Sequence, residues 1–583
     1  MNRYLVPAIA LLALIGYPIV APNATYYQTV LLFAFVVAIQ AISWNIISGF
    51  AGYISLGHSV FLGIGAYTAA IGSTRWDVNP LVVAPLGGVV AVVVALVIGG
   101  VVLRAKGPAF VIITIALLLS CQLLAINVPS VTNGSDGITL EFPFWDPGLK
   151  DIPFYYMFLG LMVLAFGFSA WIRRTKFGTG LVAIREDEGK AAAIGVPTSL
   201  YKTLAYAASA FFIGIAGGVY AYFLTFVNPL GTFNILTSVM VVLAALAGGK
   251  GTLWGPVIGA FIVSFASEAA TVYGGESQGR LLLFGLALVI IVLFLPDGLL
   301  PTVSRVLERR RAAPVEYIET PERAPVTVAG PVEPNAGPLL EIRGAHKAFG
   351  GLRAINGVEL TVPQGSVTGL IGPNGSGKTT LFNLITGPST VDKGEIWLGG
   401  VRIDGLAPWH RAHRGLGRTF QVTRLFAGMT VLENVVAPLP AFAPRVLAAG
   451  AVSGPEADRA RELLSFVGLD KFAGLRAGAL SYGQQKLVEL AQVLMLAPRL
   501  VLLDEPAGGV NPALVDRMAE IIREANRQGI TFLVVEHNIP LVLELCDPIF
   551  VLARGEVLAH GRPEEIRSDG AVLDAYLGAE VVA

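Results

Sequence analysis

One glycine-rich stretch contains the residue types that bind phosphate. Residues 372–380 read Gly-Pro-Asn-Gly-Ser-Gly-Lys-Thr-Thr and match G-x-x-x-x-G-K-[ST], the phosphate-binding loop of nucleotide hydrolases. Glycines let the backbone turn tightly and direct its N–H groups at one anion, the lysine can reach the β- and γ-phosphates, and the next hydroxyl can bind Mg²⁺. The predicted ATP-binding residues of this loop are Gly372, Pro373, Asn374, Gly375, Ser376, Gly377, Lys378, Thr379 and Thr380, with Thr379 also a predicted metal ligand.

The residues on both sides of this loop fit the same interpretation. Apolar residues 366–371 predict a short buried strand before it, and residues 381–385 predict a helix after it. The phosphates would then lie at a helix N-terminus, where free N–H groups and the helix dipole favour anions. The alternative is a glycine-rich turn with an unrelated lysine, and the matching flanks argue against it.

A second stretch ends in two acids. Residues 500–505 read Leu-Val-Leu-Leu-Asp-Glu, a predicted buried strand that delivers carboxylates at its end. Asp504 can hold Mg²⁺ through its water shell, and Glu505 can orient and deprotonate the attacking water. Such a strand is a weak signal by itself, but it follows the phosphate loop by about 120 residues, which strengthens it.

Composition divides the chain of 583 residues, which is too long for one domain. Hydrophobic residues make up 54% and charged residues only 14%, and apolar runs dominate as far as about Leu300. A membrane half is therefore joined to a soluble half. The formal net charge of zero gives no indication of a nucleic-acid partner. Two cysteines, Cys121 and Cys546, lie in unlike segments and exclude a disulfide framework or a cysteine-based metal site.

The apolar runs predict membrane helices, because lipid leaves no partner for unpaired backbone groups and a span needs about 20 residues. Ten runs qualify, so the predicted fold is a polytopic all-α membrane domain of about 10 helices; the eighth is short and can be re-entrant. The spans cover residues 4–21, 29–47, 52–72, 81–103, 110–126, 153–172, 204–227, 236–248, 255–271 and 281–299. Lys and Arg cluster at 104–106, 173–190 and 305–311, which fall on one side and predict that both termini are cytoplasmic.

Small residues recur inside these spans. Gly214 and Gly218 are four apart, as are glycines 251, 255 and 259, a spacing that predicts close helix packing. Residues 49–65 combine several glycines with Asn45 and His58 nearby. An ionisable group at membrane depth is a functional candidate, and the alternative is that His58 only caps or packs.

The loop at 184–195 has charge at its start and alanines after it, and it predicts a short surface helix. Together with stretches 44–71, 104–110, 132–137, 177–202 and 253–259, it resembles the permease subunits of branched-chain amino-acid ABC importers. The resemblance implies that 184–195 is the coupling helix that docks on an ATPase. Ala191 and Gly195 match the family's E-A-A-x-x-x-G pattern, whereas Gly189 stands where the Glu would be.

Residues 312–338 contain six prolines and predict an extended tether that cannot build a core. From Leu339 onward strand and helix patterns alternate, which is typical of an α/β fold around a phosphate loop. The predicted domains are therefore a permease domain at 1–311, a linker at 312–338 and an ATP-binding cassette domain at 339–583.

The soluble half carries a second recognisable motif, the signature of ATP-binding cassettes, in which a Tyr replaces the usual Gly. It comprises Leu480, Ser481, Tyr482, Gly483 and Gln484. Most of 339–583 resembles the ATPase subunits of the same importers. The resemblance implies that Ser481 binds the ATP of an opposite cassette. Ser481 can also be an ordinary helix N-cap, and both roles are compatible.

The resemblance also implies roles for single residues. Phe349 is similar to the aromatic residue that stacks on adenine, Gln421 to the residue that touches Mg²⁺ and senses the permease, and His537 to the catalytic histidine that contacts the γ-phosphate beside Glu505. The alternatives are a core position for Phe349 and a capped surface position for His537. Residues 508–511 take the place of the loop that links two ATP sites, with a sequence that departs from the usual one.

One cassette carries half of each ATP site, so a second cassette and a second permease half are expected, either sister chains or a second copy of this chain. The resulting hypothesis is ATP-driven import of branched-chain or related amino acids across the inner membrane, with ATP and Mg²⁺ as cofactors and a periplasmic or secreted solute-binding protein as partner. An importer of urea or short amides and an exporter are the alternatives. A third alternative is an ATPase that is only anchored to the membrane and transports nothing, but ten spans are far more than an anchor needs.

Overall fold

The computed structural model describes residues 5–146, 149, 151–274, 285–286, 289–290, 293–295, 297–303, 326–328 and 337–580. It forms two compact units. The first unit comprises residues 1–174 and 199–316, and the second comprises residues 175–198 and 317–583. The segment 175–198 thus belongs with the cassette, although it lies between membrane helices in the sequence. The predicted domain boundary at 311 falls outside the described residues.

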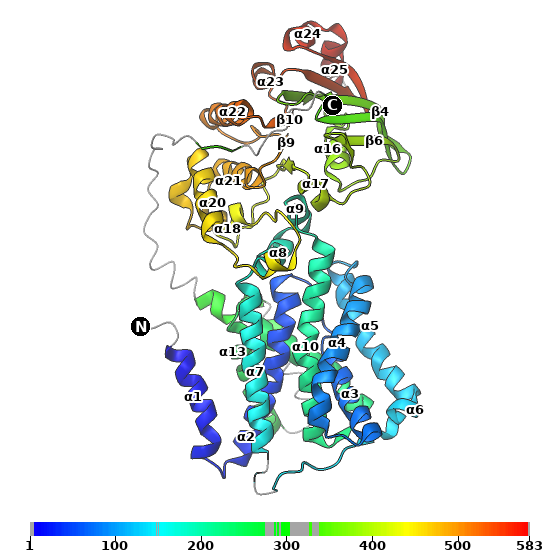
Figure 1. Ribbon diagram of the computed structural model, residues 1–583, viewed down its shortest axis with the longest axis vertical. Helices are drawn as coiled ribbons and strands as arrows, with labels where there is room; N and C mark the ends of the chain where they lie inside the picture. The colour runs from blue at the N-terminus through cyan, green and yellow to red at the C-terminus, as the bar shows by residue number, and fades with distance from the viewer. Residues whose placement is uncertain are drawn as a thin grey trace. The chain divides into compact units, whose positions relative to one another are not determined.

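The first unit is built from long apolar helices that lie side by side (Figure 1). Their bounds are α1 (Leu5–Val20), α2 (Thr25–Trp44), α3 (Val60–Trp76), α4 (Pro80–Val102), α5 (Pro108–Asn127), α7 (Ile152–Arg173), α10 (Thr198–Leu224), α12 (Ile235–Gly248) and α13 (Gly255–Gly274). Among the described residues, seven segments are long and apolar enough to cross a membrane. Helix α1 is shorter, at 16 residues, and most of the predicted tenth span falls outside the described residues.

The predicted third span is wrong at its start. The helix begins only at Val60; before it, α2 runs into a π-helix, η1 (Asn45–Phe50), and then into the non-helical residues 51–59. Side chains satisfy the freed backbone there, because the Ser48 hydroxyl donates to the Tyr53 carbonyl at 2.8 Å and the Trp44 indole donates to the Ser55 carbonyl at 2.7 Å. Non-helical backbone inside a membrane protein needs such internal partners.

The Asn45 side chain connects this interruption of the helical backbone to a second interruption. Its side-chain amide donates to the carbonyl of Thr252 at 2.8 Å and accepts from the Gly251 N–H at 2.7 Å. Both partners lie between α12 and α13, where the helical backbone is interrupted as well. His58, the other residue singled out in this region, is 1% exposed and has the rings of Phe61 and Tyr206 within 6 Å.

The glycine stripes lie at close helix crossings, as predicted. A Cβ on Gly259 in α13 would collide with the Ala244 carbonyl oxygen of α12. One on Gly214 in α10 would lie 2.6 Å from the Gly87 carbonyl oxygen of α4. Backbones that approach this closely exclude any side chain, which is the packing role of small residues in membrane helices.

The second unit contains two sheets. A four-stranded sheet of order β4-β3-β6-β7 comprises β3 (Leu340–Phe349), β4 (Leu352–Val362), β6 (Lys393–Leu398) and β7 (Val401–Arg402). A six-stranded sheet of order β12-β11-β5-β10-β9-β8 comprises β5 (Val367–Ile371), β8 (Leu416–Arg418), β9 (Leu500–Asp504), β10 (Thr531–Val535), β11 (Ile549–Ala553) and β12 (Glu556–Gly561). Strands β5, β10, β9 and β8 are parallel neighbours, and every residue of β5, β9 and β10 is buried. The predicted α/β cassette fold is confirmed.

Helices complete the second unit. Helix α16 (Lys378–Thr386) follows β5, and α18 (Val431–Val436), α20 (Gly454–Phe466) and α21 (Tyr482–Leu494) pack on one another as a helical group (Figure 1). Helix α22 (Pro512–Arg527) precedes β10.

The predicted surface helix at 184–195 is two helices. Helix α8 (Lys176–Glu186) ends at Asp187, which is extended, and α9 (Glu188–Ala193) starts there. The Asp187 carboxylate accepts the Lys190 N–H at 2.8 Å. Aspartate is a preferred N-cap because its side chain pairs with an otherwise free N–H group, so it starts a new helix instead of continuing the old one.

Part of the predicted linker enters the core. Val328 is fully buried among cassette residues, with Val326 packed against the same cluster. The Gln528 side chain accepts from the Val328 N–H at 2.6 Å and donates to the Val326 carbonyl at 3.0 Å. The expectation that the linker cannot build a core is therefore wrong for these residues, because one glutamine amide pairs with their backbone as a neighbouring strand would.

Substituting a glycine at the crossing of α12 and α13 should destabilise the protein. Gly259→Ala forces the two backbones apart, and overpacking of this kind costs about 1–3 kcal/mol. Gly160→Ala in α7 is the matched control, since its Cβ meets nothing within 4 Å. Thermal unfolding in detergent should show a lower midpoint for Gly259→Ala alone, and equal midpoints would contradict the packing role.

Candidate nucleotide-binding site

The site lies where four parallel strands end. Strand β5 leads into the phosphate loop, β9 ends at Asp504, β8 is followed by Gln421, and β10 by His537. Because these strands are parallel neighbours, their carboxyl ends meet at one edge of the sheet. Residues up to 165 positions apart in the chain are thereby brought together.

The loop itself has the conformation that only glycine adopts without strain. Gly372, Gly375 and Gly377 have φ values of 150°, 77° and 107°. A Cβ on Gly377 would lie 2.5 Å from the Ala354 carbonyl oxygen. Lys378 folds back over the loop and donates to the carbonyls of Gly372 at 2.7 Å and Pro373 at 2.9 Å. Burial lowers the pKa of Lys378, while the Glu505 and Asp504 carboxylates act in the opposite direction.

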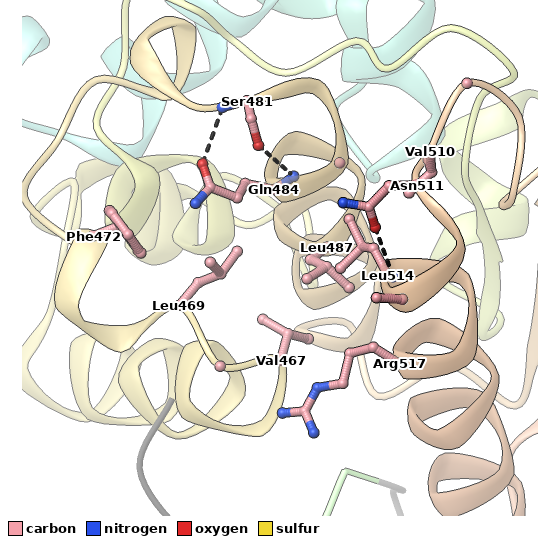
Figure 2. Close-up of a pocket in the computed structure, with 14 residues that line it drawn as sticks. Val467, Leu469, Phe472, Ser481, Gln484, Leu487, Val510, Asn511, Leu514 and Arg517 are labelled. Atoms are coloured by element: carbon pink, nitrogen blue, oxygen red, sulfur yellow. Dashed lines mark hydrogen bonds between the residues drawn. The ribbon is translucent and has the colours of Figure 1, made fainter. Parts of the chain in front are cut away.

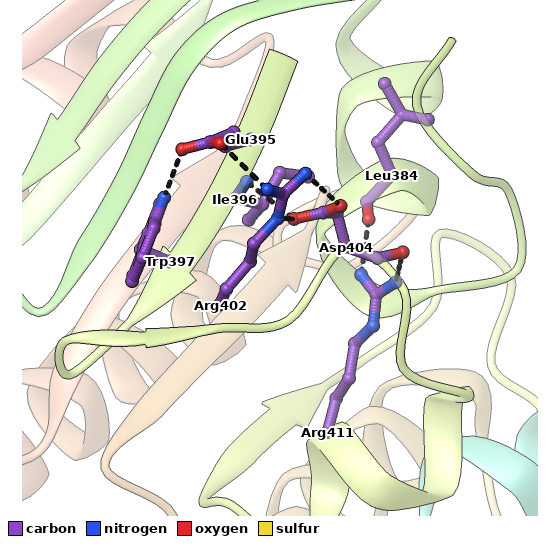
Figure 3. Close-up of polar contacts among 7 residues, drawn as sticks. All are labelled: Leu384, Glu395, Ile396, Trp397, Arg402, Asp404 and Arg411. Carbon is purple, nitrogen blue, oxygen red and sulfur yellow. Dashed lines mark hydrogen bonds and ion pairs between the residues drawn. The ribbon is translucent and has the colours of Figure 1, made fainter. Parts of the chain in front are cut away.

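A buried arginine holds the far end of α16. Arg411, 1% exposed, donates to the carbonyls of Leu384, in the last turn of α16, and Asp404 (Figure 3). It also donates to the Ile385 carbonyl in the same turn. Cations are favoured at helix C-termini, where carbonyls lack intrahelical partners. Burial lowers the pKa of Arg411 to about 10, which leaves it charged at neutral pH. The helix that begins at the phosphate loop is thus fixed at its other end.

Three predicted residues meet at one carboxylate. Glu505 accepts from the Gln421 side-chain amide at 3.0 Å on one oxygen, and the His537 Nε2 lies 3.0 Å from the other. The backbone of Glu505 has a φ of 48°, which is unusual for a residue other than glycine. Lys486 donates to the Glu505 carbonyl at 2.5 Å and so helps to hold this conformation.

Asp504 lies beside this carboxylate and is 3% exposed. Burial raises the pKa of Asp504, and Arg418, whose guanidinium lies 3.4 Å from the carboxylate, opposes that rise. Arg418 also donates to the side chains of Asn383 and Thr386 in α16. It therefore ties the acid of β9 to the helix of the phosphate loop.

Sequence reasoning missed three residues of this site, Arg418, Lys486 and Glu536. The Glu536 carboxylate accepts from the backbone N–H groups of Ala507 at 2.6 Å and His537 at 3.0 Å, and so links the segments after β9 and β10. Only Arg418 had a usable signal, since it stands three residues before Gln421. The other two act on the backbone of distant segments, which a linear pattern does not reveal.

The signature residues begin α21. Ser481 and Gln484 form a capping box in which each side chain pairs with the other's backbone N–H, at 3.4 and 3.0 Å (Figure 2). The ordinary N-cap reading of Ser481 is thus observed. Beside it lies a pocket of about 490 Å³ with apolar side chains such as Leu469 and Phe472 and with Asn511 and Arg517 at its edge. The Tyr482 hydroxyl donates to the Gln421 carbonyl at 3.1 Å and so connects the signature to the segment after β8.

Three other predicted residues lie apart from the carboxylate site. Phe349 ends β3 and is 51% exposed, with Lys347 over its ring at 5.5 Å, so the alternative of a core position for Phe349 is wrong. In the segment 175–198, Ala191 is fully buried and Gly195 has a φ of 91°. A Cβ on Gly195 would collide with the Leu439 carbonyl oxygen, so the cassette backbone approaches this glycine directly.

Comparison with known proteins gives matches in both halves. Residues 26–293 match the family "Branched-chain amino acid transport system / permease component". Residues 355–508 match "ABC transporter", and residues 556–582 match "Branched-chain amino acid ATP-binding cassette transporter".

Curated relatives match the second half. The "High-affinity branched-chain amino acid transport ATP-binding protein BraF" of Pseudomonas aeruginosa is 41% identical over 251 residues, which are 41% of this chain and 98% of that protein. The probable branched-chain amino acid transport ATP-binding protein LivG of Archaeoglobus fulgidus is 38% identical over 249 residues, 42% of this chain and 96% of that protein. LivG of Escherichia coli is 39% identical over 250 residues, with 98% of that protein covered.

Removing the charge of Arg418 should shift the pH dependence of ATP hydrolysis. Without the guanidinium, the largest effect that opposes burial is lost, so the pKa of Asp504 rises further and the carboxylate is protonated at a higher pH. Arg418→Met should therefore move the acid limb of the rate profile upward, and Arg418→Lys should move it less. Arg402→Met, which removes the ion pairs of Arg402 with Glu395 and Asp404 (Figure 3), is the control. Superimposable acid limbs for Arg418→Met and the parent would refute this link.

Proposed function

The chain belongs to the family of branched-chain amino-acid ABC transporters, with permease and ATPase in one chain, and from that premise we propose that it imports its solute across the inner membrane. One observation carries the proposal: a permease match and a cassette match with a complete phosphate loop and carboxylate site lie on a single chain. Seven apolar helices among the described residues make it a multi-pass membrane protein, and the cassette binds and hydrolyses ATP. Both termini are cytoplasmic in this proposal, because ATP is available on that side.

The phosphate loop holds the triphosphate. Its N–H groups and the N-terminus of α16 face the anion, and Lys378 exchanges its two loop carbonyls for phosphate oxygens. Phe349, exposed at the end of β3, stacks on the adenine. These roles are supported by the loop geometry and by the family to which the chain belongs.

Glu505 is the base for the attacking water. Gln421 and His537 occupy one carboxylate oxygen each, so water that reaches Glu505 is placed between an amide and an imidazole. Proton abstraction by a positioned carboxylate speeds such reactions by about 10²–10⁴-fold. His537 then contacts the γ-phosphate, and Gln421 reports the state of the site to the segment that follows β8.

The residues near the loop fit a magnesium ion. Thr379 provides a hydroxyl, Asp504 a buried carboxylate and Gln421 an amide oxygen, and oxygen donors are the ligands that Mg²⁺ prefers. When bound, Mg²⁺ neutralises the charge that develops on the phosphate oxygens. Arg418 favours the ionised form of Asp504, because its charge opposes the effect of burial on the pKa of this carboxyl.

Transport requires partners. Signature residues 480–484 lead into the first turn of α21 and serve the ATP of a second cassette, so two cassettes and two permease halves work together. The second pair is provided by sister chains or by a second copy of this chain. A periplasmic or secreted binding protein delivers the solute, and closure of the cassettes pulls on the segment 175–198.

The test of this proposal is ATPase activity of the purified chain in lipid nanodiscs, first alone and then with a candidate binding protein carrying leucine. Stimulation by the loaded protein but not by the empty one is expected for an importer, and it would also show that two copies suffice. A folded chain that binds ATP and remains unstimulated would exclude the two-copy importer. Addition of a sister permease and ATPase should then restore stimulation, and failure there too would refute import of leucine.

Replacing the proposed base should separate binding from turnover. Glu505→Gln retains the shape and the bond from Gln421 but loses the charge that accepts a proton, so ATP should bind with unchanged affinity while hydrolysis falls by about 100-fold or more. Glu564→Gln, an exposed change on α24 (Pro563–Ser568), is the control. Fluorescence measures ATP binding, and phosphate release measures hydrolysis. Near-normal hydrolysis by Glu505→Gln would contradict the assignment of Glu505 as the base.

A further inference from the structure

The segment 175–198 makes one completely buried ion pair with the cassette. The Lys190 ammonium lies 2.7 Å from the Glu489 carboxylate, and both side chains are 1% exposed. Burial lowers the pKa of Lys190, and the Glu489 carboxylate acts in the opposite direction. A buried ion pair rarely stabilises a fold more than an apolar pair of the same volume would, because both charges lose their water. Its presence here therefore calls for a reason other than stability.

The surroundings of the pair connect it to the ATP site on two sides. The Lys190 ammonium lies 6.0 Å from the ring centre of Phe420 and 5.9 Å from that of Phe426, on either side of the segment that begins with Gln421. Arg424 of the same segment pairs with Asp187, the cap of α9, at 3.1 Å. Helix α9 is thus held to the residues directly after β8.

The second connection runs through α21. Glu489 and Lys486 are three residues apart on this helix and so share a face. Lys486 holds the Glu505 carbonyl, and the N-terminus of the same helix carries Ser481. One rigid helix therefore joins the partner of Lys190 both to the proposed base and to the signature.

The segment makes two further ion pairs with the cassette, and water reaches both. Lys176 lies 3.0 Å from Glu456, which is 29% exposed, and in the Arg424–Asp187 pair the two side chains are 47% and 27% exposed. Ala191 and Ile194 are buried apolar residues that any apolar surface would accept. Lys176 donates to the Val436 carbonyl, and the Ile194 carbonyl accepts from the Leu439 N–H, both of which are backbone bonds available in any cassette of this fold. The Lys190–Glu489 pair differs from the two other ion pairs in that both of its side chains are 1% exposed, so a cassette without an acid at 489 leaves the Lys190 charge buried and uncompensated.

We propose that the Lys190–Glu489 ion pair is a specificity determinant that decides which cassette the segment 175–198 accepts. It rests on the proposed function, in which this segment transmits closure of the cassettes to the permease. A cassette with an acid at this position pairs with Lys190. A cassette without one leaves a buried charge uncompensated, and such a mismatch is strongly unfavourable. This matters because the chain works beside a second cassette that could otherwise dock on the same segment.

The test compares matched and mismatched pairs in the full-length chain. Lys190→Glu, Glu489→Lys and Lys190→Met are mismatched variants, whereas the double swap Lys190→Glu/Glu489→Lys and the apolar pair Lys190→Met/Glu489→Leu are matched. Amide hydrogen exchange of residues 186–195 measures docking. Exchange in the mismatched variants should be faster by roughly tenfold or more, because an uncompensated buried charge opens the interface, and both matched variants should regain protection.

The readouts separate this proposal from its premise. ATPase activity stimulated by the binding protein should rank the variants in the same order as amide protection does. If the parent chain shows no such stimulation, the proposed function is contradicted. Hydrogen exchange then still tests whether the Lys190–Glu489 pair determines docking. Charge reversal of the exposed pair Arg459–Glu462 in α20 is the control and should change neither readout. Equal protection in matched and mismatched variants would overturn the proposal, as would failure of both matched variants in folded protein with an unchanged thermal midpoint.

Discussion

The parallel alignment of β5, β10, β9 and β8 is the constraint on which the candidate site depends. With β10 between β5 and β9, the carboxyl end of each strand lies next to that of its neighbour, so a loop, a histidine and two acids share one edge. Burial of every residue in β5, β9 and β10 makes this alignment costly to disturb, since a shift in register would expose apolar side chains. The chemistry at the edge is thus anchored by a core that takes no part in it.

Buried cations recur at the places where the backbone leaves regular structure. Lys378 donates to two carbonyls of the phosphate loop, Lys486 to the carbonyl of Glu505, and Arg411 to the last turn of α16. The carbonyls of Pro373 and Glu505 each accept one local backbone N–H as well, from Ser376 at 3.3 Å and from Gly508 at 3.1 Å, and the cation fills the second acceptor position. A buried carbonyl left without any partner costs about 1–3 kcal/mol. A cation with several donors satisfies such groups together, which explains why turns with strained φ values persist here.

The sequence predicts those features of the fold that depend on local pattern. The phosphate loop, the strand ending in Asp504 and the apolar helices are recognisable because their residue types repeat over short distances. The wrong predictions for the third span and for the helix at 184–195 have a common cause. At 51–59 and at Asp187, a side chain pairs with nearby backbone and ends the helix that the apolar or alanine-rich pattern favours. Lys486 and Glu536 could not be recognised, because the backbone groups of Glu505 and Ala507 that they bind are 19 and 29 residues away and are brought near only by the fold.

Helix α10 continues directly from the segment 175–198 in the chain. It begins at Thr198, where the segment 175–198 ends, so any displacement of that segment acts directly on the first turn of α10. In that turn Lys202 donates to the Tyr53 hydroxyl at 2.9 Å and to the Leu103 carbonyl at 3.3 Å. Tyr53 belongs to the non-helical residues 51–59, which have fewer backbone bonds of their own than a helix. Lys202 therefore links the non-helical residues 51–59 to the helix that continues from the segment 175–198.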